Sequence, residues 1–332
     1  MYDTLAKLLI KTNQYDEASK WFESALNDSR VFDLTDTYLN YVDLLITREK
    51  LDEALEMLEK GIHSNAVKNP LQLYHKLSEI LATSGKIIEA TTLLKGTLRN
   101  ETLAKEPSIY LTCAKIYFKN KQLDEAINIL KQGLQKQGLK DKGQIYVMTS
   151  DYLQRQGKID EAISLLLQGI NDKREYTHFS LYQSCADLMT KAGRITDAIT
   201  LIEKGIESQA QSNKAILYQT YAKLLEKCGN TPRAIEVLKG AIKIPGIPGK
   251  VALYQTCASL LTKIGLENEA IKLLKSAINS SKLGNLVSLY QQCAEIMYSL
   301  KQHGDALSVL NQGLIEYPND KNLKLAISKN NL

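Results

Sequence analysis

The sequence has few of the features that mark specialised classes of protein. Its 332 residues include six prolines, eighteen glycines and one tryptophan, which excludes collagen-like chains and Pro/Gly-rich disordered chains. No apolar run reaches the roughly 18 residues of a membrane span, and the N-terminus lacks the pattern of a signal peptide. Five cysteines are too few for a disulfide scaffold of this length. We therefore expect a cytoplasmic protein with free thiols and no membrane partner.

What the sequence does have is a repeat of 36 residues. Tyrosine recurs at this interval without a break, as Tyr2, Tyr38, Tyr74, Tyr110, Tyr146, Tyr182, Tyr218, Tyr254 and Tyr290. An alanine stands sixteen residues after each of them, from Ala18 to Ala306. A fixed period between 20 and 50 residues is the signature of repeat architectures, so the chain is predicted to consist of nine equivalent units.

Each unit predicts two helices. In the sixth unit, Tyr182, Cys185, Ala186 and Met189 have the i, i+3, i+4, i+7 spacing of one helix face. A residue suited to a left-handed helix cap follows, and in six units it is Asn13, Gly85, Gly157, Gly193, Gly229 or Gly265. A second amphipathic run then begins near the conserved alanine. One such pair cannot bury its own apolar face, so we predict an all-α fold, a right-handed α-solenoid of stacked antiparallel helix pairs.

The unit resembles a tetratricopeptide repeat. Tyr182 stands at the tryptophan position of that motif, Ala186 at its small position and Ala198 at its near-invariant alanine. Each unit is two residues longer than usual, and the terminal proline appears only as Pro318. The resemblance covers essentially the whole chain. It implies a non-enzymatic scaffold that binds a protein or peptide in a concave groove, and by analogy a recognition arm of a larger signalling or defence protein.

The repeat also predicts the organisation of the chain. We expect a single continuous array over residues 1–317, with units that start near residues 1, 35, 71, 107, 143, 179, 215, 251 and 287. A capping helix and tail should occupy residues 318–332, with Leu323, Leu325 and Ile327 as apolar positions. Met1 directly precedes the first tyrosine, so the first helix lacks its usual start, and we expect further sequence before it.

Pentatricopeptide repeats, which bind RNA, are the alternative. They share these spacings and select bases with residues two after and three before the tyrosine. The first of these positions is polar here in Thr4, Asn40, Thr112, Ser184, Thr220 and Thr256, but the second holds residues such as Leu71, Phe179 and Val251. The net charge of +5 is also mild for a nucleic-acid binder. We favour the tetratricopeptide repeat and keep helical-repeat RNA binding as the second hypothesis.

Groups that suggest chemistry are explained by the repeat. Cys113, Cys185, Cys257 and Cys293 occupy one position of the unit, which predicts a role in packing. Paired acids such as Asp16 and Glu17 precede the conserved alanine, where they would offset the helix dipole. The histidines, at 63, 75, 178 and 303, have no metal-ligand spacing. We predict no catalytic residue, no metal and no cofactor, and hence no enzyme.

Helical geometry predicts where a ligand would bind. Positions one, five, eight and nine residues after the tyrosine lie opposite the core stripe, and in the tetratricopeptide-repeat family such positions carry the ligand contacts. In units two to five this stripe is mainly apolar, whereas from unit six onward it carries amides and charges. The candidate groove residues are Gln183, Gln219, Gln255, Gln291, Asp187, Lys191, Lys223, Lys227, Lys263 and Glu295.

The lysines of this set have two explanations. They lie in the last turn of a helix, where cations are favoured by the dipole, or they form a basic track for an acidic peptide, a C-terminal carboxylate or a phosphate backbone. Residues 1–200 carry 26 basic and 27 acidic side chains, whereas residues 201–332 carry 16 and 10. No unit has the lysine and asparagine pair that chaperone-binding tetratricopeptide repeats use, so that subclass is excluded.

Overall fold

The computed structural model describes residues 2–139, 141–172, 179–208, 211–280 and 283–330. Within these ranges every regular element is a helix, so the prediction of an all-α array of helix pairs is confirmed. The chain forms two compact units, Met1–Lys158 and Ile159–Leu332. The continuity of the array over residues 1–317 and the hand of the solenoid stay predictions.

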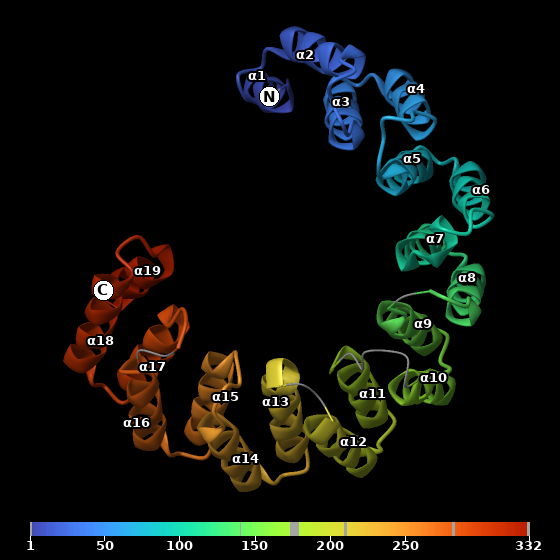
Figure 1. Ribbon diagram of the computed structural model, residues 1–332. Helices are drawn as coiled ribbons and strands as arrows, with labels where there is room; N and C mark the ends of the chain where they lie inside the picture. Colours follow the sequence, from blue (N-terminus) through green and yellow to red (C-terminus); the bar gives the residue numbers. More distant parts are fainter. Residues whose placement is uncertain (1, 140, 173–178, 209–210, 281–282, 331–332) are drawn as a thin grey trace. The chain divides into compact units, whose positions relative to one another are not determined.

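The first unit holds the helices of four complete repeats and the first helix of the fifth. They are α1 (Tyr2–Lys11), α2 (Tyr15–Asn27), α3 (Thr35–Thr47), α4 (Leu51–Ile62), α5 (Pro70–Thr83), α6 (Ile87–Thr97), the 3-10 turn η1 (Leu103–Lys105), α7 (Pro107–Lys119), α8 (Leu123–Gln135) and α9 (Gly143–Arg155). Consecutive helices pack against each other, and α3, α5 and α7 also contact the first helix of the next repeat. The odd-numbered helices therefore form one layer of the unit and the even-numbered helices the other (Figure 1).

The second unit continues the same alternation (Figure 1). It contains α10 (Ile159–Asn171), α11 (Phe179–Lys191), α12 (Ile195–Ser208), α13 (Gln211–Lys227), α14 (Thr231–Lys243), α15 (Lys250–Lys263), α16 (Glu267–Ile278), α17 (Val287–Ser299), α18 (His303–Glu316) and α19 (Lys321–Asn330). Here α11, α13, α15 and α17 are the first helices of their repeats. Each of them except α17 contacts the next first helix, and α17 contacts α19.

Small residues allow the helices to approach closely. The alanine sixteen residues after each tyrosine is fully buried in all nine repeats, from Ala18 to Ala306. The four cysteines of the repeat position are buried as well, and all five thiols are free. The predicted packing role of these residues is confirmed. The acidic pairs also lie where they were expected, in the first turn of α2, α4, α8 and α10.

The turn between the two helices of a repeat has one conformation throughout. Its central residue has a positive φ in every repeat, at Asn13, Glu49, Gly85, Lys121, Gly157, Gly193, Gly229, Gly265 and Lys301. The amide of the following residue donates to a carbonyl five residues back, as from Arg194 to Met189 (2.8 Å), which is the Schellman bond. The six predicted caps are confirmed. Three further repeats adopt the same turn without glycine or asparagine, which the sequence did not suggest.

The C-terminal helix α19 begins at Lys321, three residues after Pro318. Its first turn is capped by Asp320, whose Oδ1 accepts from the amides of Asn322 (2.9 Å) and Leu323 (3.0 Å). Leu323 is fully buried and Ile327 packs on the same core. Leu325, the third of the predicted apolar positions, is 52% exposed. Residues 331 and 332 of the predicted tail lie outside the described residues.

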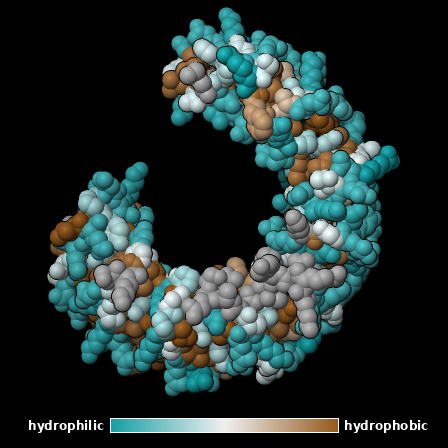
Figure 2. Space-filling model, in the orientation of Figure 1, coloured by the Kyte–Doolittle hydropathy of each residue, from teal (hydrophilic) through white to brown (hydrophobic). Residues whose placement is uncertain are grey.

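Hydrophilic residues cover most of the face drawn in Figure 2, and apolar residues gather in small patches, including over α3 and α5. None of the helices in the described ranges is both long and apolar enough to cross a membrane.

Candidate ligand groove

The candidate residues of the predicted ligand stripe are all at least partly exposed on the first helices. Positions five and nine after the tyrosine are exposed at each candidate charged residue, namely Asp187, Lys191, Lys223, Lys227, Lys263 and Glu295. Position one differs, because all four glutamines are only half exposed. The candidate residues therefore divide into an exposed charged row and a half-buried amide row.

One glutamine of the amide row, Gln219, forms part of the seam between neighbouring first helices. Gln219 of α13 donates its Nε2 to the carbonyl oxygen of Ala252 (3.1 Å) and to Thr256 Oγ1 (2.9 Å), both on α15. Gln292 of α17, which stands two residues after its tyrosine and is outside the amide row, donates to the carbonyl oxygen of Gln255 (3.0 Å) and to Ser259 Oγ (2.9 Å) on α15. The Gln219 amide group thus holds two repeats together, and its donor is not free for a ligand.

One member of the charged row is engaged in a similar way. Lys263 Nζ on α15 lies 2.6 Å from Glu226 Oε1 on α13. Glu226 stands eight residues after its tyrosine, so this ion pair spans the space between two first helices. Lys223 and Lys227, one turn apart on α13, form no ion pair within the described part of the chain.

A pocket of about 530 Å³ lies between α5 and α7, on the predicted stripe but in the first unit. Its wall on α5 includes positions one, five, eight and nine after Tyr74. The lining residues are His75, Glu79, Ala82, Thr83, Gly85, Ile87, Thr112, Lys115, Ile116, Lys119 and Asn120. The pocket thus shares positions with the predicted stripe, but it lies in repeats that the sequence had assigned a mainly apolar surface.

One wall of the pocket is formed by the small residue that stands eight after the tyrosine of this repeat. Across the repeats this position holds Ile10, Ile46, Ala82, Phe118, Gln154, Thr190, Glu226, Thr262 and Tyr298, and alanine is the smallest. In the next groove, between α7 and α9, the ring of Phe118 stacks on Tyr152 with centroids 4.7 Å apart, and Arg155 lies over the same ring (5.1 Å). A large side chain at this position occupies the space that Ala82 leaves open.

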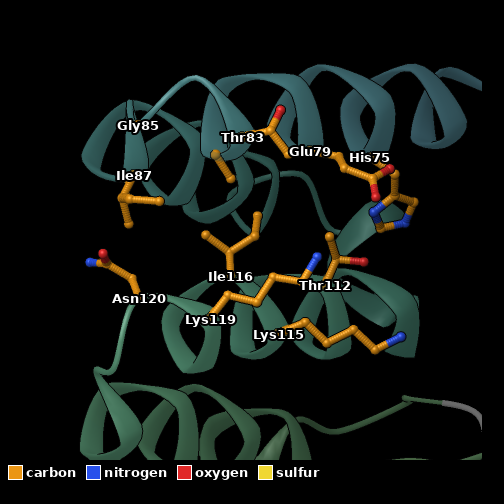
Figure 3. A pocket seen from close by; sticks show the side chains of 11 residues that line it. His75, Glu79, Thr83, Gly85, Ile87, Thr112, Lys115, Ile116, Lys119 and Asn120 are labelled. Carbon is orange, nitrogen blue, oxygen red and sulfur yellow. The ribbon is translucent and has the colours of Figure 1, made fainter.

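The two ends of the pocket differ in chemistry (Figure 3). Ile87 and Asn120 lie at one end, and His75, Thr112 and Lys115 at the other. The side chain of Lys119 runs along α7, so that its ammonium group reaches the middle of the gap near Thr112. Neither Lys115 nor Lys119 forms an ion pair within the described ranges. The pocket therefore offers two available cations beside an aliphatic end.

His75 shapes the polar end of the pocket. Its Nε2 lies 3.1 Å from Ser108 Oγ on α7, whereas its buried Nδ1 has no hydrogen-bond partner among the described residues. Burial lowers the pKa of His75, and the nearby charge of Lys115 lowers it further, while Glu79 opposes the shift. The imidazole is therefore held neutral at physiological pH, and the positive charge of the pocket comes from the two lysines.

A smaller pocket of about 310 Å³ lies in the second unit, where α19 packs beside α17 and α18. Its lining includes the candidate residues Gln291 and Glu295, together with Tyr298, Asn322 and Leu325. The structure thus places these two candidates at a pocket. Of the remaining candidates, Gln219 lies at the seam, Gln183 and Gln255 are half exposed, and the charged residues lie on the exposed row.

The described residues contain no group of three or more histidine, cysteine, aspartate or glutamate side chains arranged to hold a metal ion. Of the histidines, His178 lies outside the described residues. Burial raises the pKa of Cys113 to about 11 and that of Cys185 to about 12.

Two family models match parts of the chain. The ARM repeat of tetratricopeptide repeat protein 21 matches residues 94–180, and the tetratricopeptide repeat matches residues 1–27. None of the curated proteins matches the chain.

The solved structures that match the chain are distant in sequence. Naa15/Naa10 bound to HypK-THB is 17% identical, with a TM-score of 0.40 over 87% of this chain and 43% of that one. The APC/C heterotetramer Cut9–Hcn1 is 16% identical, with a TM-score of 0.38 over 95% and 58%. A tetratricopeptide repeat protein from Parabacteroides merdae is 16% identical, with a TM-score of 0.41 over 79% and 98%. The chain spans about half the length of the first two.

Proposed function

Because the chain belongs to the tetratricopeptide-repeat family, we propose that it is a non-enzymatic scaffold that binds a segment of a partner protein between α5 and α7. The observation that carries this proposal is the pocket of about 530 Å³ on the predicted ligand stripe. Its size falls within the roughly 300–1,000 Å³ of ordinary ligand sites. Its lining combines aliphatic surface with a few polar groups, as such sites do.

The absence of catalysis is part of the proposal. The nucleophilic form of cysteine is the thiolate. The raised pKa values of Cys113 and Cys185 keep both side chains as protonated thiols at neutral pH. His75 Nε2 lies beside the Ser108 hydroxyl, but its buried Nδ1 has no hydrogen-bond partner among the described residues, so no third group orients the imidazole as a general base requires. These features support binding over group transfer.

Protein is favoured over RNA as the partner for a local reason. The RNA hypothesis uses the polar residue two after the tyrosine to select a base. At Thr220 and Thr256 this hydroxyl donates to a carbonyl oxygen of its own helix, that of Ile216 (3.0 Å) and Ala252 (2.9 Å). A hydroxyl has one hydrogen to donate, so these side chains have no donor left for a base edge.

A selection from a library of random linear peptides tests the proposal. Peptides enriched on the full chain should bind it and should fail to bind Ala82→Phe, since the phenylalanine fills the pocket as Phe118 fills the next groove. Ala82→Leu closes the same space with a smaller side chain and should also weaken binding. Thermal melts of both variants establish that they fold.

Thr262→Phe is the matched control, because Thr262 occupies the same position of the repeat on α15. This variant should keep wild-type affinity. If the selected peptides bind Ala82→Phe and Ala82→Leu as well as they bind the wild type, the groove between α5 and α7 is not the binding site.

A further inference from the structure

From the two ends of the pocket we infer the chemical class of its ligand. We propose that the groove between α5 and α7 binds an acidic segment in which an aliphatic side chain lies next to carboxylates. The inference rests on the proposed function, because it concerns the same site. It assigns one end of the pocket to the aliphatic side chain and the other to the carboxylates.

The aliphatic end is formed by Ala82, Ile87 and Ile116. Ile87 is half-buried, and the next residue, Ile88, is 81% exposed. In four repeats an aspartate stands at the position of Ile88, as at Asp52 and Asp124. In this repeat the apolar surface therefore continues from the pocket onto Ile88. In those four repeats the same position carries a negative charge. An aliphatic side chain buried there would favour binding, because its apolar surface is removed from water.

The polar end carries the charge that selects the rest of the ligand. Lys115 and Lys119 are one helical turn apart on α7, so their side chains share a face. Glu79 is the one acidic residue among the pocket lining, and it lies beside His75 (Figure 3). With His75 neutral, two cations and one anion give this end a net positive charge. Carboxylates of the ligand complement it, whereas basic side chains would be repelled.

Two other lysines of the first helices are already neutralised within the protein. Lys263 pairs with Glu226 at 2.6 Å, and Lys76 on α5 pairs with Asp43 on α3 at 2.6 Å. Lys115 and Lys119 differ in lining an open pocket without such a partner. Lys223 and Lys227 have the same positions in their repeat and the same spacing. Before α13, however, Thr190 stands at the position of Ala82, and Glu226 lies beside the two lysines on α13 itself.

Fluorescence anisotropy with four labelled peptides tests the inference on the full chain. The reference peptide carries leucine followed by two glutamates between flexible Gly-Ser ends. The other three replace the glutamates with glutamines, the glutamates with lysines, or the leucine with alanine. We expect the glutamine peptide to bind about fivefold more weakly, as suits exposed ion pairs, and the alanine peptide about tenfold more weakly. The lysine peptide should not bind measurably.

The lysines are tested by a pair of double variants. Lys115→Ala with Lys119→Ala should bind the reference peptide about fivefold more weakly and should no longer distinguish it from the glutamine peptide. Lys223→Ala with Lys227→Ala, the matched control, should behave as wild type. Equal binding of the glutamate and glutamine peptides to the wild type would overturn the inference. It would leave the proposed function intact, provided that Ala82→Phe still abolished binding.

Discussion

The ring of Tyr182 packs so closely on Gly205 that a Cβ atom on the glycine would lie 2.8 Å from Tyr182 Cδ1. The same contact recurs between Tyr38 and Gly61, Tyr110 and Gly133, and Tyr290 and Gly313, and all four tyrosines are buried. Where the equivalent residue is larger, at Ala25, Thr97, Ala241 and Ala277, the tyrosine of the repeat is half exposed: Tyr2, Tyr74, Tyr218 and Tyr254. The depth of the tyrosine is therefore set by one side chain on the second helix.

Gly205→Ala should destabilise the protein by about 1–3 kcal/mol, because the added methyl group overpacks the contact with Tyr182. Gly240→Ala, in a helix with nothing within 4 Å of the added atom, should instead stabilise it by about 0.5–1 kcal/mol. Chemical denaturation of the full chain measures both. Stability changes of opposite sign for the two variants support the close packing of Tyr182 on Gly205. Equal stability changes would refute it.

The turns without glycine offer a second prediction. Lys301 has a φ of 60° at the position where Gly265 has 78°, and a side chain in that region costs roughly 1–2 kcal/mol. Lys301→Gly should therefore raise stability by about 0.5–1 kcal/mol, after the extra chain entropy of glycine is subtracted. Gly265→Ala should lower it. A melting temperature of Lys301→Gly below that of the wild type would contradict the assignment of strain.

Stability should depend on pH through His75. Burial and Lys115 lower its pKa in the folded state, so the unfolded chain binds this proton first as the pH falls below about 6.5. The associated stability is present above that pH and is lost between the unfolded and the folded pKa. The melting temperature of the wild type should thus fall more between neutral pH and about pH 5 than that of His75→Gln.

Glutamine suits this comparison because it occupies the same position in four later repeats and can keep a hydrogen bond to Ser108. If the melting temperatures of the two proteins fall equally over this pH range, the pKa of His75 is not lowered in the folded state as its surroundings indicate.

Gln219→Ala should lower stability by about 1 kcal/mol, because it removes the bonds to Ala252 and Thr256 across the seam. Lys223→Ala, on the exposed row of the same helix, should leave stability within about 0.5 kcal/mol of the wild type. Urea denaturation distinguishes the two. If Gln219→Ala has the same stability as the wild type, the Gln219 side chain is available to bind a ligand.

The fold could be predicted from the sequence because its signals are local and repeated nine times. The spacing from Tyr182 to Ala198 recurs in every unit, and the small residue is needed wherever two helices meet. The turn at Lys301 could not be predicted from its residue type, because the packing of the two flanking helices imposes a conformation that lysine disfavours.

The candidate site was predicted less well, for a physical reason. The sequence places Gln219 on the open side of its helix, but only the spacing between α13 and α15 shows that its amide reaches the next repeat. The wall of the pocket between α5 and α7 includes the small side chain of Ala82. Comparing residue sizes at that one position along the repeats would have indicated it, whereas a search for polar residues could not.

The most direct test of partner binding is a crystal structure of the full chain with the leucine–glutamate peptide. We expect the peptide between α5 and α7, with its leucine against Ile87 and Ile116 and its carboxylates within hydrogen-bonding distance of Lys115 or Lys119. A peptide bound instead along α13 and α15, with the groove between α5 and α7 empty, would contradict the proposed site.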